Sequence, residues 1–213
     1  MVRTPTLTIF RSDEALELNQ IIKKLGMNTE VCNEDFLMQF FKSYRAPNCL
    51  ISRLDCQLRK FENLQILNLS NNHICKIENL PANLKELSLT NNHIDDIEVL
   101  RSAHLNLIAL SLSYNQVKNC DLVTICKNFP NLFCLDVSFN QLNDFRNCIA
   151  WVEGLEKLKM FYIQGNPIAL CNQGREILKQ RMPELCILDG SPAFTEIEVN
   201  DRKKFMKKMA RLQ

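Results

Sequence analysis

LQILNLSNNHI, at residues 64–74, decides the fold of this chain, because its skeleton LxxLxLxxNxI returns four more times. The further copies are LKELSLTNNHI (84–94), LIALSLSYNQV (107–117), LFCLDVSFNQL (132–142) and LKMFYIQGNPI (158–168). Their starts lie 20, 23, 25 and 26 residues apart. Repetition at this period indicates a solenoid, in which each unit packs against its neighbours.

A single unit cannot fold alone, because it buries too little apolar surface. Fixing the backbone costs about 1–2 kcal/mol per residue, and fully burying one aliphatic side chain returns about 1.5–3 kcal/mol. The first copy offers Leu64, Leu67, Leu69 and Ile74, so the units must stack. We predict an α/β solenoid in which Leu67, Leu69 and their counterparts lie on short strands. These strands form one parallel sheet along a concave surface.

An asparagine follows each predicted strand at the same position of the repeat. Its amide carries two donors and an acceptor oxygen, so it can satisfy backbone groups where the chain turns away from the sheet. Five copies in register favour this structural role over that of a solvated turn residue. The predicted ladder consists of Asn72, Asn92, Asn115, Asn140 and Asn166.

The ends of a solenoid need caps, because an open edge strand invites aggregation. Residues 1–48 are expected to form an N-terminal helical cap. One helix is predicted between Ser12 and Gly26, and a second from about Asn33 to Pro47. The alternative role of these helices is a partner-binding hairpin.

The solenoid itself is predicted to span residues 49–190. It opens with CLISRLDCQLRKF, at 49–61, which resembles a degraded repeat without the asparagine. The apolar positions of this partial repeat are expected at Leu50, Leu54 and Leu58.

Longer connections in the second half of the chain predict helices on the convex side. The returns at 121–129 and 148–158 are long enough for one or two helical turns, unlike the earlier ones. A short helix is then expected around Ile177, ended by Pro183. A strand at 185–188 completes the predicted C-terminal cap.

Residues 191–213 are predicted to form a separate basic amphipathic helix. It carries apolar residues at helical spacing between its positive charges. The helix could meet a polyanion such as an acidic tubulin tail, or pack its apolar face along the solenoid. The basic residues proposed for contact are Lys203, Lys204, Lys207, Lys208 and Arg211.

Composition and motifs exclude several classes of function. The net charge is only +2, so no global field favours nucleic acid. We find no apolar run that suits a signal peptide or a membrane span, and expect a cytoplasmic protein. Phosphate-binding loops and hydrolase motifs are missing, so no catalysis, cofactor or small-molecule substrate is predicted. The ten cysteines and three histidines show no zinc-binding spacing, and no metal site is expected.

The concave face is where we expect a protein partner to bind. Variable positions that flank the buried leucines point outward there, and in the last three repeats many of them are aromatic or apolar. Such enrichment suits an interface core, although the terminal helices of the chain itself could cover part of it. The predicted partner-binding residues are Ile66, Glu86, Ile108, Tyr114, Phe133, Asp136, Phe139, Met160 and Tyr162.

The repeats, together with GNP at 165–167 and MPELCILD at 182–189, resemble the cytoplasmic, short-type leucine-rich repeat family and its C-terminal cap. That family includes axonemal dynein light chains, dynein-arm assembly factors and a regulator of type-1 phosphatase. The resemblance covers about residues 49–190. It implies a non-catalytic scaffold, adaptor or assembly factor of the ciliary or flagellar axoneme, with dynein, a radial spoke or tubulin as partners.

Two other functions stay open at this point. One is a regulatory subunit that holds an enzyme such as type-1 protein phosphatase on the concave face. The other is a ribonucleoprotein assembly module, because one spliceosomal subunit is also a capped repeat protein of this kind.

Overall fold

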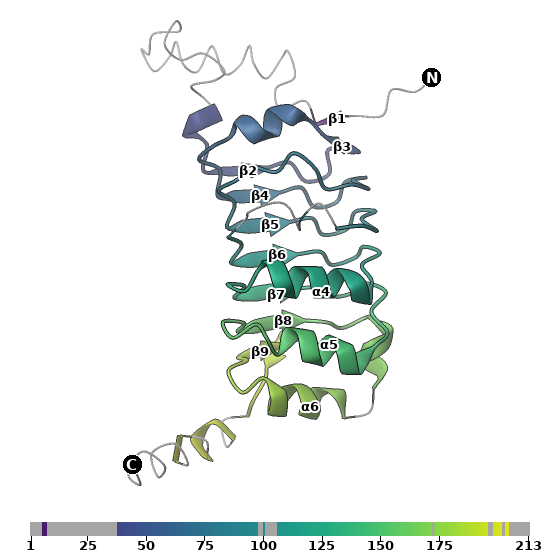
Figure 1. Ribbon diagram of the computed structural model, residues 1–213, viewed down its shortest axis with the longest axis vertical. Helices are drawn as coiled ribbons and strands as arrows, with labels where there is room; N and C mark the ends of the chain where they lie inside the picture. Colours follow the sequence, from purple (N-terminus) through teal and green to yellow (C-terminus); the bar gives the residue numbers. More distant parts are fainter. Residues whose placement is uncertain are drawn as a thin grey trace, which may run out of the picture.

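The computed structural model describes residues 6–7, 38–97, 100, 106–171, 173–195, 198–201 and 203–204. Its centre is an eight-stranded sheet with the order β10-β9-β8-β7-β6-β5-β4-β2. The strands stack along the long axis of the molecule in the order of the chain (Figure 1). All neighbours are parallel except β9 and β10, which are antiparallel. The predicted α/β solenoid with a parallel sheet is confirmed.

The strands of this sheet are short, because each repeat turns away from the sheet after three residues. They are β2 (Ser43–Arg45), β4 (Ile66–Asn68), β5 (Glu86–Ser88), β6 (Ala109–Ser111), β7 (Cys134–Asp136), β8 (Met160–Tyr162), β9 (Ile187–Leu188) and β10 (Ser191–Pro192). A separate two-stranded pair joins β1 (Thr6–Leu7) to β3 (Arg53–Leu54).

The central residues of strands β4 to β8 form the core. Neighbouring strands are paired so that these residues lie side by side, from Leu67 through to Phe161. None is more than 2% exposed. The five that share this layer are Leu67, Leu87, Leu110, Leu135 and Phe161. The hydrophobic positions of the repeat therefore make one continuous interior, as stacking requires.

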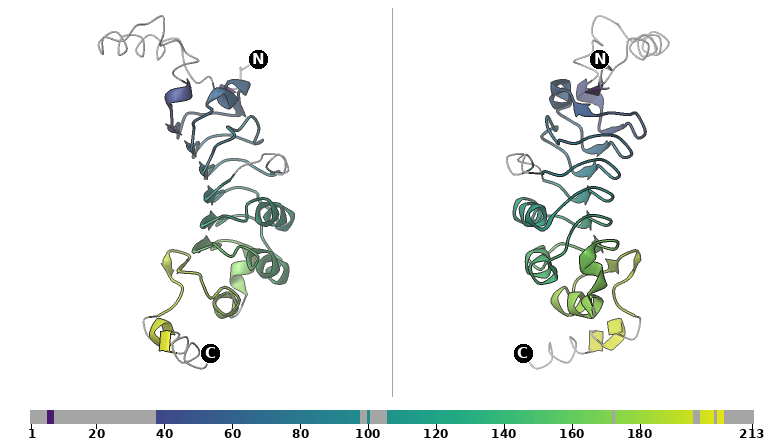
Figure 2. Two further views of the ribbon diagram at one scale, coloured as in Figure 1. Left: turned by 60° about the vertical axis from the view of Figure 1, so that its left-hand side comes forward. Right: turned by 90° about the vertical axis from the view of Figure 1, so that its right-hand side faces the viewer.

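Among the described residues, three named helices cover the second half of the convex side, and Leu100 is also helical in the return before β6. The three helices are α4 (Asn119–Asn128), α5 (Phe145–Val152) and α6 (Gly174–Arg181), which follow the longer returns. Figure 2 shows them on the side of the stack opposite to the strands. Two short 3₁₀ helices, η1 (Cys56–Lys60) and η2 (Pro167–Leu170), complete the connections. In the described part of the chain, no helix has the length and hydropathy to cross a bilayer.

The N-terminal end of the sheet differs from the prediction. A strand, β2, already pairs with β4 before the expected boundary at residue 49, with Tyr44 opposite Leu67. Leu50, which was predicted to be an apolar core position, is 59% exposed, and Ile51 is buried instead. Leu54 and Leu58 are buried as predicted. The strand of this unit was missed because Cys49 stands where the other units have asparagine.

The helix predicted between residues 12 and 26 lies outside the described residues. Of the helix predicted at 33–47, residues 38–40 are helical, but Ser43–Arg45 form strand β2 instead, because they pair with β4. The C-terminal cap is as predicted, with α6 followed by β9. Arg175 on α6 holds the helix to the last two strands, because its guanidinium donates hydrogen bonds to the carbonyl oxygens of Leu188, at 3.3 Å, and Pro192, at 2.7 Å.

The basic helix was predicted to begin at residue 191, but Ser191–Pro192 form strand β10 and the described helical residues begin at 198. Residues 198–201 and 203–204 are helical, and Lys203 and Lys204 are exposed. Lys204 lies 3.9 Å from the carboxylate of Asp201. The remaining basic residues of that prediction, Lys207, Lys208 and Arg211, lie outside the described part.

Candidate functional site: the concave face and its edge

The asparagine ladder holds the turn that ends each strand. Asn92 shows the pattern: its Nδ2 donates to the carbonyl oxygens of Leu69, at 3.1 Å, and Leu89, at 2.9 Å. Its Oδ1 accepts from the amide of Ile74 at 3.0 Å. All five ladder asparagines are buried. They join consecutive repeats and are unavailable to a partner, because an unpaired buried amide is costly.

A second polar ladder lies on the concave face, at the ends of the strands. Hydroxyl groups bond across repeats, with Ser70 2.8 Å from Ser88 and Thr90 2.8 Å from Ser111. Asp136 ends this series, since it accepts from the hydroxyls of Ser111, at 3.2 Å, and Ser138, at 2.6 Å. The strand ends therefore present a continuous band of polar side chains.

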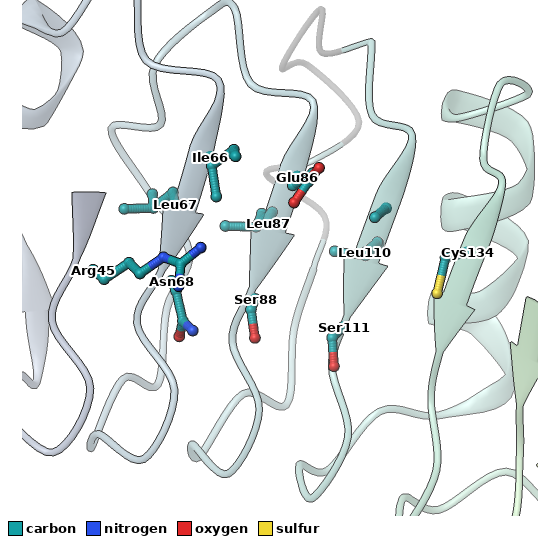
Figure 3. Close-up of a pocket in the computed structure, with 11 residues that line it drawn as sticks. Arg45, Ile66, Leu67, Asn68, Glu86, Leu87, Ser88, Leu110, Ser111 and Cys134 are labelled. Carbon is teal, nitrogen blue, oxygen red and sulfur yellow. The ribbon is translucent and has the colours of Figure 1, made fainter. Parts of the chain in front are cut away.

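A shallow hollow of about 210 Å³ lies over strands β2 to β7. Figure 3 shows that its side chains come from successive strands, with Arg45 at one end and Cys134 at the other. Ile66 and Glu86, two of the predicted partner-binding residues, line it. Arg45 was missed by the sequence analysis. The stretch FKSYRAPNCLI at 41–51 has apolar residues at the spacing of the repeat. This spacing could have placed Arg45 on the first strand of the sheet.

The acidic residues of the face act on the groups beside them. Burial raises the pKa of the Cys134 thiol, and the carboxylates of Asp136 and Glu86 raise it further. Burial also raises the pKa of Tyr162, with Cys134 and Asp136 adding to the effect. Both groups therefore stay protonated and neutral near pH 7, so Cys134 is a poor nucleophile there.

The predicted apolar residues do not form one patch. Ile108 and Phe133, 43% and 45% exposed, directly precede β6 and β7. Tyr114 and Phe139 follow the same strands and lie across the polar band, six residues further along the chain. Met160 and Tyr162, on β8, are half-buried.

Tyr114 and Phe139, called the aromatic pair below, stack face to face. Their ring centroids are 4.2 Å apart with an angle of 10° between the planes. The two residues remain 51% and 39% exposed. Both residues have left-handed backbones, with φ of 55° and 52°, which side chains of this size rarely adopt.

Gly165 makes room for the aromatic pair in the next repeat. Its φ is +71°, and a Cβ atom built on it would lie 2.3 Å from the ring of Phe139. The equivalent position in the first two full repeats carries Asn71 and Asn91, whose side chains share a 2.9 Å hydrogen bond. The position before the ladder asparagine therefore changes from a polar to an aromatic residue along the solenoid.

The repeating strands, buried leucines and asparagine ladder define the class of protein. A family model, Leucine Rich Repeat, matches residues 63–82. The chain belongs to the leucine-rich repeat proteins. Its fold resembles that of an internalin from Listeria monocytogenes, with a TM-score of 0.51 and 21% identity, over 73% of this chain and 44% of that one. This likeness concerns the fold alone.

Among curated proteins, the chain is similar to leucine-rich repeat-containing protein 43. It is 34% identical to the mouse protein over 177 residues, which is 80% of this chain and 26% of that protein. It is 33% identical to the human protein over 168 residues, with 76% and 26% coverage. The chain thus spans about a quarter of the length of these relatives.

Proposed function

We propose that this chain is a non-catalytic scaffold that binds another protein along its concave face. The observation that carries the proposal is the exposed aromatic pair. A left-handed backbone at a tyrosine or phenylalanine costs on the order of 1–3 kcal/mol. The two side chains nevertheless bury only part of their apolar surface. Large aromatic side chains held rigidly at a surface are typical anchors of protein interfaces.

The surroundings of the aromatic pair suit a protein partner. A polar band with satisfied hydrogen bonds adjoins it, and Met160 and Tyr162 offer further half-buried surface on β8. Glu86 and Asp136 add negative charge at the centre of the face. An apolar anchor beside polar groups is the usual composition of an interface.

The chemistry of the face supports a role without catalysis. Asp136 accepts hydrogen bonds from the hydroxyl groups of Ser111 and Ser138, and no histidine is among the residues that line the described hollow. A hydroxyl nucleophile needs such a base. Elsewhere, burial raises the pKa of Cys126 and Cys148 to about 12, so these thiols are not activated either.

The finer proposal is that the scaffold acts in the cytoplasm and the axoneme of a cilium or flagellum, as a structural component or assembly factor. Its support is the resemblance of the repeats and the cap to the short-type family with axonemal members. Dynein, a radial spoke or tubulin are the expected partners. The described part of the basic helix, with exposed Lys203 and Lys204, is compatible with an acidic partner such as a tubulin tail.

The test is crosslinking with mass spectrometry in ciliated cells that express the tagged full chain. Tyr114→Ala with Phe139→Ala should remove the main crosslinked partner while thermal unfolding stays cooperative. Leu170→Ala is the control, because Leu170 is 85% exposed on η2, outside the concave hollow. An unchanged set of partners in the aromatic variant would overturn the binding role of this face.

Fractionation of the same cells tests the location. Detergent-resistant axonemes should retain the tagged chain. A soluble complex with a phosphatase, or a nuclear complex with RNA, would replace the axonemal proposal by one of the two alternatives.

A further inference from the structure

We infer that His73 and His93 form a two-histidine binding site for a tetrahedral transition-metal ion, with zinc as the best match. The site lies where the first two full repeats leave β4 and β5, outside the hollow and the aromatic pair. It does not depend on the proposed function, and the spacing of the histidines in the sequence did not predict it.

The two imidazole rings face each other across adjacent repeats. His73 Nδ1 and His93 Nε2 share a 3.3 Å hydrogen bond, in which one ring donates and the other accepts. The ring centroids are 5.4 Å apart and the planes differ by 16°. The hydrogen bond requires the two nitrogens to point toward each other. Both residues are exposed, so an ion from solvent can reach them.

The nitrogen separation matches one coordination geometry better than others. Zn–N bonds of about 2.0–2.1 Å at a tetrahedral angle place two ligand nitrogens about 3.3–3.4 Å apart. Neighbouring ligands in a square-planar site lie closer, at about 2.8–2.9 Å. Zinc would replace the proton of this hydrogen bond. The two exposed rings would rotate so that both nitrogen lone pairs point at the ion.

The backbone holds both histidines in place before an ion binds. The amide of His73 donates to the carbonyl oxygen of Ile51 at 2.7 Å, and that of His93 to the carbonyl of Ile74 at 2.9 Å. The next residues, Ile74 and Ile94, are fully buried. Two ligands fixed on neighbouring repeats bind one ion with less loss of conformational entropy than two independent side chains.

The site supplies two ligands and leaves the other positions for water. Within the described ranges, no group of three or more His, Cys, Asp or Glu residues could enclose a metal ion. Cys75 is exposed two residues after His73, and its thiol donates to the His73 carbonyl oxygen at 3.7 Å. Because a thiol can also bind zinc, any test must distinguish binding by Cys75 from binding by the two histidines.

The experiment is a titration of the purified full chain with ZnCl₂, followed by calorimetry and by NMR of the histidine rings. Wild type and Cys75→Ser should bind one ion at the pair and shift the ring signals of both histidines. His73→Gln and His93→Gln should each lose at least about tenfold in affinity. Zinc should also raise the Tm of wild type more than that of either variant.

Three outcomes would overturn the inference. They are no zinc binding in the wild type, equal binding in the histidine variants, and a loss of binding in Cys75→Ser alone. Titration with CuSO₄ tests the geometry separately, because binding of copper without zinc would contradict the tetrahedral assignment. Circular dichroism of both glutamine variants confirms that the repeats remain folded.

Discussion

The two halves of the solenoid share one interior and differ on their surfaces. From β2 to β5 the strand ends are polar, the position before the ladder asparagine holds Asn71 and Asn91, and the described part of the return at 77–80 has no helix. From β6 to β9 that position holds the aromatic pair and then Gly165, and the returns carry α4, α5 and α6.

This difference shows which positions of the repeat are constrained. Residues inside the stack contact both neighbours, so packing at close to crystal density restricts them to large aliphatic or aromatic side chains. Residues at the edge contact only the turn before and after. They can therefore change from asparagine to tyrosine or phenylalanine without altering the strands.

The largest expected effect is the same in both halves. Leu87→Ala and Leu135→Ala each remove a fully buried side chain and should lower the free energy of unfolding by about 2–5 kcal/mol. Urea denaturation followed by circular dichroism measures both. If one of the two substitutions were neutral, the halves would not share one cooperative interior.

Gly165→Ala should destabilise the second half by about 1–3 kcal/mol, because it forces a left-handed backbone and displaces the ring of Phe139. Gly190→Ala is the matched control: its φ is +76°, but nothing lies within 4 Å of the added Cβ. Urea denaturation measures the free energy of unfolding of both variants. The difference between the two losses gives the contribution of the contact between residue 165 and the Phe139 ring. An equal loss in both variants would show that Phe139 moves aside freely.

Replacing Tyr114 and Phe139 by asparagine gives the second half the same residue that the first half has at this position, in Asn71 and Asn91. Loss of the stack costs about 0.5–1.5 kcal/mol, whereas asparagine tolerates the left-handed backbone better. We therefore expect a net change below about 1 kcal/mol in thermal or urea denaturation. A loss of several kcal/mol would mean that the aromatic pair belongs to the core, and would weaken its assignment as an anchor.

The smallest effect concerns the C-terminal end alone. Hydrogen bonds from Lys179 and from the backbone and side chain of Thr195 lower the pKa of Glu198 from 4.5 to about 2. The ionised carboxylate favours the folded contact. Its contribution is complete above pH 4.5 and is lost as the pH falls toward 2. Hydrogen exchange should show this end loosening first in acid.

Glu198→Gln provides the control for that pH dependence. The variant should show weaker protection after Ala193 at neutral pH and little further change down to pH 3. If wild type and variant responded alike to acid, Glu198 would not be the group responsible.

Much of the fold was predictable, because hydrophobic periodicity reports directly on burial. Leu67, Leu87 and Leu110 recur at one position of the repeat, and the structure places them in one layer. The first unit escaped prediction because Tyr44 and Cys49 replace the expected leucine and asparagine. Its strand forms through pairing with β4, which supplies the backbone partners that its own sequence does not announce.

The candidate site was predictable only in part. Of the predicted residues, Ile66 and Glu86 line the hollow, and Tyr114 stacks on Phe139. The separation into an aromatic edge and a polar band was not foreseen. Tyr114 and Phe139 stack because adjacent repeats bring equal positions close together. His73 and His93 meet for the same reason, although 20 residues separate them in the chain.

By itself, the sequence determined that the repeats must stack, where most strands lie, and that asparagine ends them, because these features depend on periodic burial within each unit. Only the tertiary structure decided which surface groups meet across units, where the sheet begins, and how Gly165 accommodates Phe139. Those contacts depend on the register and spacing of neighbouring repeats, which no single repeat contains.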